Sequence, residues 1–352
     1  MSVEVQGADE QTVQQFLKKA GWADAVYEPM AADMGLRRYA RLKRDGQKAL
    51  FMDMSRAGIL ETGLGNYIKI AEHCRSHNIR VPAIYSYDLE TGLAVVEDLG
   101  RISFGNARKV GAKDVELYGL ATKILGQIRD SDRTNDLKLT GYKDTLIYKR
   151  LQQFVDWYMT VATSRQTTKS DQDAFYAALA EIEENLPNCP MAICHADYHL
   201  ENLIWCPEHP QGYGLIDFQD AFWGPMPYDL LNLLEDARQT VPEDIKTTMK
   251  EKYCEGMGAE AREAFDAWYV YMSMQFHCRV SGLFIKFSIK NNGVEFLDHI
   301  PRLQGYIGQN LEHPLMRPLK RFFDENKVSL NYDRDIKSNI DFIKVSAPML
   351  TS

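Results

Sequence analysis

The sequence contains no long apolar run, no excess of basic residues and no CxxC pair of cysteines. A membrane-spanning helix needs about 20 consecutive apolar residues, so we expect no membrane partner. The formal charge of −8 argues against a general nucleic-acid-binding surface, because such a surface needs a basic face. The first 16 residues lack a basic start followed by an apolar core, so no secretory signal is expected.

The six cysteines are scattered along the 352 residues without a CxxC pair. Reduced thiols in a cytoplasmic protein are the simplest interpretation of this spacing. Apolar residues make up 45% of the chain and charged residues 26%, the mixture of an ordinary globular protein. The length allows two domains or one large bilobal fold, and we expect a small-molecule partner with no obligate protein partner.

The first hundred residues predict a small antiparallel sheet with one long helix inserted. Residues 9–20 (DEQTVQQFLKKA) indicate an amphipathic helix after an acidic cap. Apolar strands flank Asp45-Gly46, which is a strong hairpin-turn signal. A helix fits residues 62–78, and two further strands fit 82–88 and 93–98.

After residue 110 the sequence is dominated by helical periodicity. The predicted helices cover residues 113–130, 142–162, 171–186, 228–237, 243–256, 260–290 and 294–310. Only the stretch 191–218 is strand-like. We therefore expect an α+β chain with a β-rich lobe over residues 1–100 and a larger, mainly helical lobe over residues 101–352.

A dense group of polar residues lies at 195–202, in the sequence HADYHLEN. The segments LIWC (203–206) and GLIDF (214–218) predict two short strands, joined by a loop with two prolines and two glycines. Antiparallel pairing of these strands would bring Asn202 and Asp217 to the same end of the hairpin. Asp197 lies five residues before Asn202, on the loop that leads in.

This set of two acids and an amide suits phosphoryl transfer. Mg²⁺ prefers hard oxygen ligands such as a carboxylate and an amide oxygen, and a further carboxylate can orient an acceptor hydroxyl and take its proton. His195, Asp197, Asn202 and Asp217-Phe218 match the template H-x-D-x-x-x-x-N followed by D-F. Two other interpretations stay open: a zinc or iron site built on HxDxH, and a loop with no chemistry.

These motifs resemble the aminoglycoside phosphotransferase and choline-kinase-like group of small-molecule kinases. In that group a histidine commonly stands two residues after the catalytic aspartate, as His199 does here. Four segments resemble a bacterial branch of anomeric kinases that act on N-acetylmuramate and N-acetylglucosamine: GLRRYAR (35–41), FVDWY (154–158), 216–238 and 281–302. The resemblance covers nearly the whole chain. It implies a bilobal protein-kinase-like fold, with ATP and Mg²⁺ as cofactors.

The resemblance assigns a role to each matching residue of the catalytic loop. Asp197 becomes the catalytic base, and Asn202 and Asp217 become the Mg²⁺ ligands. His195 supports the loop. His199 either faces the transferring phosphate or fills space.

Outside the loop, the resemblance concerns the hinge and one helix start. The Glu97 carbonyl and the Leu99 amide would meet the adenine edge at the hinge between the lobes. Asp229 would anchor the backbone of the catalytic loop, with a simple helix N-cap as the alternative. The expected glycine-rich loop over the phosphates is reduced to a single residue, Gly35.

The chain departs from the kinase pattern in strand 49–54, which has no interior lysine. Lys48 stands only at its start. Arg37 and Arg38 are better candidates for the phosphate contact, because arginine can bind phosphate bidentately; a solvated strand face is the alternative. Glu72, on the predicted helix 62–78, is either the acidic partner of this cation or a surface residue.

The acceptor site is predicted from four residues. Asp156 and Trp157 of FVDWY would flank a sugar by hydrogen bonding and stacking, although a tryptophan at helical spacing is more often part of the core. Asp220 and Arg279 are further substrate candidates, and Arg279 would contact an anionic group.

We therefore expect an ATP-dependent kinase that phosphorylates a hydroxyl of a small molecule, namely the anomeric hydroxyl of an amino sugar. The alternatives within this enzyme class are an aminoglycoside kinase and a choline- or homoserine-type kinase. An alternative of another class is a non-catalytic, nucleotide-binding pseudokinase.

Overall fold

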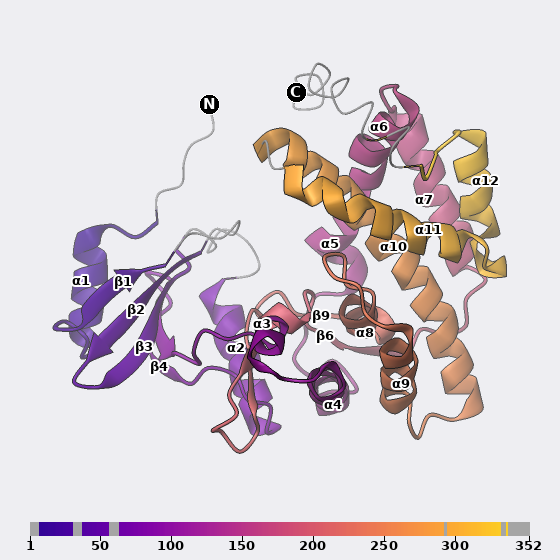
Figure 1. The fold of residues 1–352 in the computed structure, drawn as a ribbon. Coiled ribbons are helices and arrows are strands. Elements are labelled where there is room, and N and C mark those ends of the chain that lie inside the picture. Colours follow the sequence, from indigo (N-terminus) through magenta and orange to yellow (C-terminus); the bar gives the residue numbers. More distant parts are fainter. Residues whose placement is uncertain (1–6, 31–36, 56–62, 292–293, 332–335, 337–352) are drawn as a thin grey trace. The chain divides into compact units, whose positions relative to one another are not determined.

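The computed structural model describes residues 7–30, 37–55, 63–291, 294–331 and 336. The chain divides into two compact units (Figure 1). The first comprises Met1–Asp132 and His195–Ala221, and the second comprises Arg133–Cys194 and Phe222–Ser352. The predicted boundary at residue 100 lies inside the first unit, so the division into lobes at that residue remains a prediction.

The first unit is built on a five-stranded antiparallel sheet. Its strands are β1 (Val26–Pro29), β2 (Arg38–Arg44), β3 (Gln47–Asp53), β4 (Ile84–Asp88) and β5 (Leu93–Glu97), in the order β1-β2-β3-β5-β4. Between β2 and β3, Asp45 and Gly46 have φ values of 48° and 78°. Two positive φ values are the signature of a type I′ turn, and the predicted hairpin is confirmed.

Helix α1 (Glu10–Lys19) covers one face of this sheet (Figure 1). The Asp9 side chain caps the helix by accepting a hydrogen bond from the Thr12 N–H at 2.8 Å, as the acidic cap predicts. Phe16, Leu17 and Trp22 are buried against strand residues. The strand residues of this cluster are Ala40, Leu42, Ala49, Phe51, Leu93 and Val95.

The rest of the first unit is helical, with one short hairpin. Its helices are α2 (Leu64–Ser76), α3 (Phe104–Ala107) and α4 (Asp114–Ser131), with a 3₁₀ turn at Arg108–Val110. A second 3₁₀ turn, Leu200–Asn202, leads into the antiparallel pair β7 (Leu203–Trp205) and β8 (Tyr213–Leu215).

The second unit is mainly helical. The antiparallel pair β6 (Met191–Cys194) and β9 (Phe222–Pro225) stands at the two points where the chain leaves and re-enters this unit. The helices are α5 (Leu146–Lys149), α6 (Thr160–Thr163), α7 (Lys169–Glu183), α8 (Pro227–Leu234), α9 (Glu243–Tyr253), α10 (Ala259–Asn291), α11 (Ile300–Leu311) and α12 (Arg317–Glu325). The described part of this unit also contains 3₁₀ segments at Tyr142–Asp144, Val294–His299 and Pro314–Met316, and a π-helix at Phe154–Met159.

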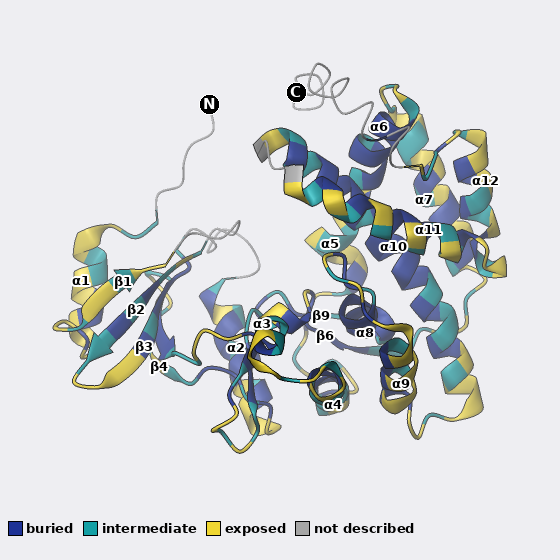
Figure 2. Cartoon of the chain, viewed as in Figure 1, coloured by how far each residue is buried: buried dark blue, intermediate teal, exposed yellow. Residues whose placement is uncertain are grey.

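Helix α8 is the most completely enclosed of these elements, because all of its residues are buried, as its dark blue colour in Figure 2 shows. None of the helices among the described residues is both long and apolar enough to cross a membrane.

The single helix predicted over residues 142–162 is wrong. Thr145 caps a new helix, α5, by accepting a hydrogen bond from the Tyr148 N–H. Farther on, Phe154–Met159 forms a π-helix before α6 begins. The apolar spacing is present throughout this stretch, but a cap and a change of helix type interrupt it. Such π segments often occur at functional sites.

Candidate catalytic site

The hairpin β7–β8 brings Asn202 and Asp217 together, as predicted. Leu203 pairs with Leu215, and beyond that pair the Ile216 N–H donates to the Asn202 carbonyl at 3.0 Å. Asp217 therefore follows the strand end that faces Asn202. Its φ is 63°, and Ala196, just before Asp197, has φ 86°. Left-handed backbone at residues other than glycine costs on the order of 1–3 kcal/mol, and such positions concentrate at functional sites.

His195 links the two ends of this loop. It is 2% exposed, and its Nε2 lies 2.9 Å from the Ile216 carbonyl oxygen. Burial lowers the pKa of His195 below its usual value, which favours the neutral ring, with the Nε2–H donating to that carbonyl. The imidazole thus links the start of the loop to the residue before Asp217, and its supporting role stays a prediction.

His199 is held in one tautomer by the loop around it. Its Nδ1 accepts a hydrogen bond from the Glu201 N–H at 3.2 Å, so in the neutral ring the proton is on Nε2. That Nε2 lies 3.3 Å from Asp197 Oδ2. The side chain of Asp197 is 56% exposed. His199 therefore lies against one oxygen of a carboxylate whose side chain is largely exposed.

The two predicted metal ligands present oxygen atoms. The Asn202 Nδ2 donates to the Asp197 backbone carbonyl at 2.8 Å, which fixes the amide and leaves its Oδ1 for another partner. The Asp217 side chain is 35% exposed. A carboxylate and an amide oxygen are the hard donors that Mg²⁺ prefers, so these residues fit the ion. No three His, Cys, Asp or Glu side chains of the described residues form a metal-binding group, so the zinc or iron alternative is not supported.

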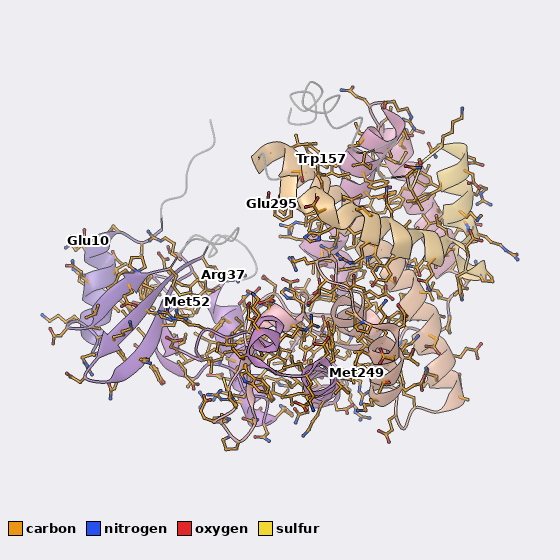
Figure 3. All side chains as sticks on the ribbon, viewed as in Figure 1. Glu10, Arg37, Met52, Trp157, Met249 and Glu295 are labelled. Atoms are coloured by element: carbon orange, nitrogen blue, oxygen red, sulfur yellow. The ribbon has the colours of Figure 1, made fainter. Side chains whose placement is uncertain are left out.

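Arg37, labelled in Figure 3, forms ion pairs with this acidic loop although it lies 180 positions earlier in the sequence than Asp217. It lies directly before β2, and its guanidinium bridges Asp217 at 2.5 Å and Asp220 at 2.8 Å. Gln219 bridges the same two carboxylates through its Nε2, at 2.9 Å and 3.1 Å. Asp220, predicted as a substrate residue, therefore belongs to an ion-pair cluster. The sequence signal for this cluster is the run DFQD at 217–220, in which the glutamine, Gln219, was not predicted as a site residue.

Arg38 has different partners from Arg37. Its side chain pairs with Asp53, which is 1% exposed, and donates to the Ala8 carbonyl. Lys48 and Glu72 are exposed. Of the candidates for the phosphate contact, Arg37 is thus the one that lies at the catalytic loop. Gly35 lies outside the described residues.

Helix α2 supports the segment after Asp217. The ring of Tyr67 stacks on Phe218, with centroids 4.7 Å apart and planes at 27°. One residue earlier on the helix, the Asn66 Nδ2 donates to the Gln219 carbonyl at 3.1 Å. Both contacts link residues more than 150 positions apart in the chain, and no local sequence signal indicates them.

The predicted hinge lies at the end of β5. The Glu97 side chain accepts hydrogen bonds from Arg80 at 2.7 Å and from the Ala83 N–H at 3.1 Å, which fixes the strand end. Within the described part of the chain, the Leu99 N–H donates no hydrogen bond. The Leu99 side chain packs on Gly214, where an added Cβ would lie 2.5 Å from Leu99 Cδ1. A cavity of about 210 Å³ adjoins Glu97 and Arg80 and does not include the catalytic loop.

The other predicted residues lie in the second unit. Asp229, 2% exposed, stands in the first turn of α8, but the cap position is Met226, so the N-cap interpretation of Asp229 is wrong. Asp156 lies on the π-helix and accepts hydrogen bonds from the side-chain amides of Gln152 at 3.0 Å and Gln172 at 2.8 Å.

Trp157 and Arg279 differ in their surroundings. Trp157, on the same π-helix, is only 5% exposed, which favours the core interpretation over sugar stacking. Arg279 is a partly exposed residue, and its guanidinium lies over the Phe276 ring and donates to the Tyr228 hydroxyl at 3.3 Å.

Comparison with known proteins agrees with this geometry. The model of the phosphotransferase enzyme family matches residues 26–268. The N-acetylmuramate/N-acetylglucosamine kinase of Caulobacter vibrioides is 28% identical over 349 residues, which cover 88% of this chain and 94% of that kinase.

Solved structures agree in fold. The choline kinase LicA of Streptococcus pneumoniae has a TM-score of 0.60 at 13% identity, with 85% of this chain and 99% of that chain covered, and it also matches in its complex with AMP. A putative aminoglycoside phosphotransferase of Ralstonia eutropha has a TM-score of 0.58 at 12% identity, with 89% and 98% covered. At these identities the likeness shows the fold alone, and the predicted α+β, protein-kinase-like fold is confirmed.

Proposed function

The chain belongs to the phosphotransferase enzyme family and is a nucleotide-binding kinase of small molecules, and from this premise we propose that its acceptor is an amino sugar, phosphorylated at the anomeric hydroxyl. The observation that carries this proposal is the Caulobacter relative, which aligns over nearly the full length of both chains. The geometry supports a kinase, because the exposed carboxylate of Asp197, the proposed metal ligands Asn202 and Asp217, and the cation Arg37 all lie in the first unit.

In this proposal Asp197 accepts the proton of the acceptor hydroxyl and orients it for attack on the terminal phosphate. His199 is a positioning residue, because its Nε2–H is directed to Asp197 Oδ2 while its Nδ1 is bonded to the Glu201 amide. His195 links the two ends of the loop by its hydrogen bond to the Ile216 carbonyl.

The nucleotide site is proposed from the same unit. The Glu97 carbonyl and the Leu99 N–H receive the adenine edge, and Asn202 Oδ1 with the Asp217 carboxylate holds Mg²⁺. The ion would supply charge neutralisation of the phosphate oxygens when bound. Asp217 fits that role because its carboxylate is partly exposed while the backbone directly before it is fixed by the hydrogen bond from the Ile216 N–H to the Asn202 carbonyl.

The acceptor groups are proposed in the second unit. Asp156 is a candidate because it lies on a π-helix with its carboxylate oriented by two glutamine amides. Arg279 would contact a carboxylate on the sugar. Trp157 has a packing role in this account. Asp229, buried at the start of α8, supports the enclosed helix that follows the catalytic segment.

The test is an acceptor panel with Mg²⁺ and ATP, followed by ³¹P NMR of the products. The panel holds N-acetylglucosamine, N-acetylmuramate, their 1-O-methyl glycosides, an aminoglycoside, choline and homoserine. We expect anomeric phosphates from the two free sugars and none from the glycosides. Phosphorylation of a glycoside as fast as its free sugar would refute the anomeric assignment. Turnover only with the aminoglycoside, choline or homoserine would refute the amino-sugar proposal.

A further inference from the structure

We propose that Arg37 is an internal counter-ion that excludes a divalent cation from Asp217 and Asp220 until nucleotide phosphates draw the guanidinium away. This inference rests on the proposed assignment of Asp217 as a metal ligand. It concerns the order of events at that ligand, and the identity of the acceptor does not enter it.

The first observation is the way in which Arg37 occupies the two carboxylates. Its Nη1 lies 2.5 Å from Asp217 Oδ1, and its Nη2 lies 2.8 Å from Asp220 Oδ2. The side chain of Arg37 is 17% exposed, whereas those of Asp217 and Asp220 are 35% and 39% exposed. An arginine side chain remains charged in proteins, so the guanidinium is a permanent positive charge between the two carboxylates. A metal ion at Asp217 must therefore compete with a fixed positive charge.

The second observation is that the two carboxylates are held in place independently of Arg37. Gln219 is 1% exposed, and its Nε2 donates to Asp217 at 2.9 Å and to Asp220 at 3.1 Å. The flanking Phe218 is stacked on Tyr67 of α2. Departure of the guanidinium therefore leaves a preorganised acidic pair rather than a collapsed loop.

The charges decide the direction of the effect. With Arg37 in place, the cluster carries one net negative charge. The electrostatic attraction of this cluster for Mg²⁺ is then too weak to offset the cost of removing water from the ion. Without Arg37, two carboxylates face the ion. Phosphate groups are strong bidentate partners for guanidinium, so a nucleotide can release the pair and bring the metal in the same step.

Metal and nucleotide binding are thus expected to be positively coupled through one side chain. This coupling would also account for an arginine before β2, since the one lysine of β3, Lys48, is exposed near the start of that strand. Nucleotide binding would form the contact between Arg37 and the phosphates and, in the same step, remove the positive charge of Arg37 from the two carboxylates.

The test measures Mn²⁺ binding without nucleotide or sugar, by electron paramagnetic resonance of free Mn²⁺. The proteins are the wild type, Arg37→Met, Arg37→Lys, the charge-matched control Arg101→Met, and the double variant Arg37→Met/Asp217→Asn. Arg101 is 67% exposed and pairs with Glu28 at 4.0 Å, away from the acidic pair, so its removal makes the same change in net charge as the removal of Arg37. Circular dichroism verifies that each variant is folded.

We expect Arg37→Met to bind Mn²⁺ at least about tenfold more tightly than the wild type, a change of 1.4 kcal/mol. Arg101→Met should match the wild type, Arg37→Lys should gain less than Arg37→Met, and Asp217→Asn should remove the gain. Equal affinity of the wild type and Arg37→Met would overturn the counter-ion proposal while leaving the kinase assignment intact. A gain that survives Asp217→Asn would place the ion elsewhere and overturn it as well.

Discussion

Gly282 allows the backbone of α10 to pack directly against the backbone at Gln153 and Phe154 in the second unit. Its replacement by alanine tests that packing. A Cβ at this position would lie 2.1 Å from the Gln153 carbonyl oxygen, 2.3 Å from its carbon and 2.7 Å from the Phe154 nitrogen. All three atoms belong to the backbone that starts the π-helix Phe154–Met159, so none can rotate away. Overpacking typically costs about 1–3 kcal/mol, and contacts this short belong at the upper end or beyond it.

Alanine in place of glycine also improves helix propensity, by about 1 kcal/mol in a helix interior. The net expectation for Gly282→Ala is therefore a loss of about 2 kcal/mol. The matched control is Gly305→Ala on α11, where an added Cβ meets nothing within 4 Å and only the propensity gain remains. Urea unfolding followed by circular dichroism measures both. The reasoning is refuted if Gly282→Ala is as stable as the wild type, or if both variants shift in the same direction.

Two further substitutions test ion pairs that the structure assigns. Arg38→Met should lower the free energy of unfolding by about 2 kcal/mol, within the range for leaving a buried polar group without its partner, because Asp53 is 1% exposed whereas the Arg38 side chain is 44% exposed and solvent weakens the pair; an unchanged melting temperature would contradict this. The hydrogen bond from Arg165 is the main cause that lowers the pKa of Asp171 in the folded protein. The ionised carboxylate therefore stabilises the fold fully above the unfolded pKa of about 3.9, and this stabilisation is lost as the pH falls through the folded pKa. Asp171→Asn should therefore flatten the acid-induced loss of stability below about pH 4, measured by urea midpoints from pH 5 to pH 2. Parallel midpoint curves for the two proteins would count against the pair.

The features that the sequence predicted correctly depend on local signals. The Asp45-Gly46 hairpin follows from turn chemistry, because both residues accept positive φ. The convergence of Asn202 and Asp217 follows from the register of one short hairpin. The cap of α1 is likewise local, because Asp9 accepts its hydrogen bond from Thr12, three positions later in the chain.

The features that the sequence missed are set by contacts between distant residues. Arg37 and Asp217 are 180 positions apart, and nothing near Arg37 shows that its partner is the predicted metal ligand. The π-helix begins where its backbone meets Gly282, a contact that apolar periodicity does not register. The 294–310 stretch was predicted as one helix, but α11 begins only at Ile300, with Pro301 in its first turn.

Asp197 as the base of a small-molecule kinase is the central claim, and the most direct test compares Asp197→Asn with the wild type in turnover and in nucleotide binding. The side chain is 56% exposed, so the substitution is not expected to unfold the protein. Asparagine keeps the size of the side chain but cannot take the acceptor proton, so we predict a fall in kcat of at least about a hundredfold with nucleotide affinity unchanged. Full turnover by Asp197→Asn on every accepted substrate would contradict the assignment.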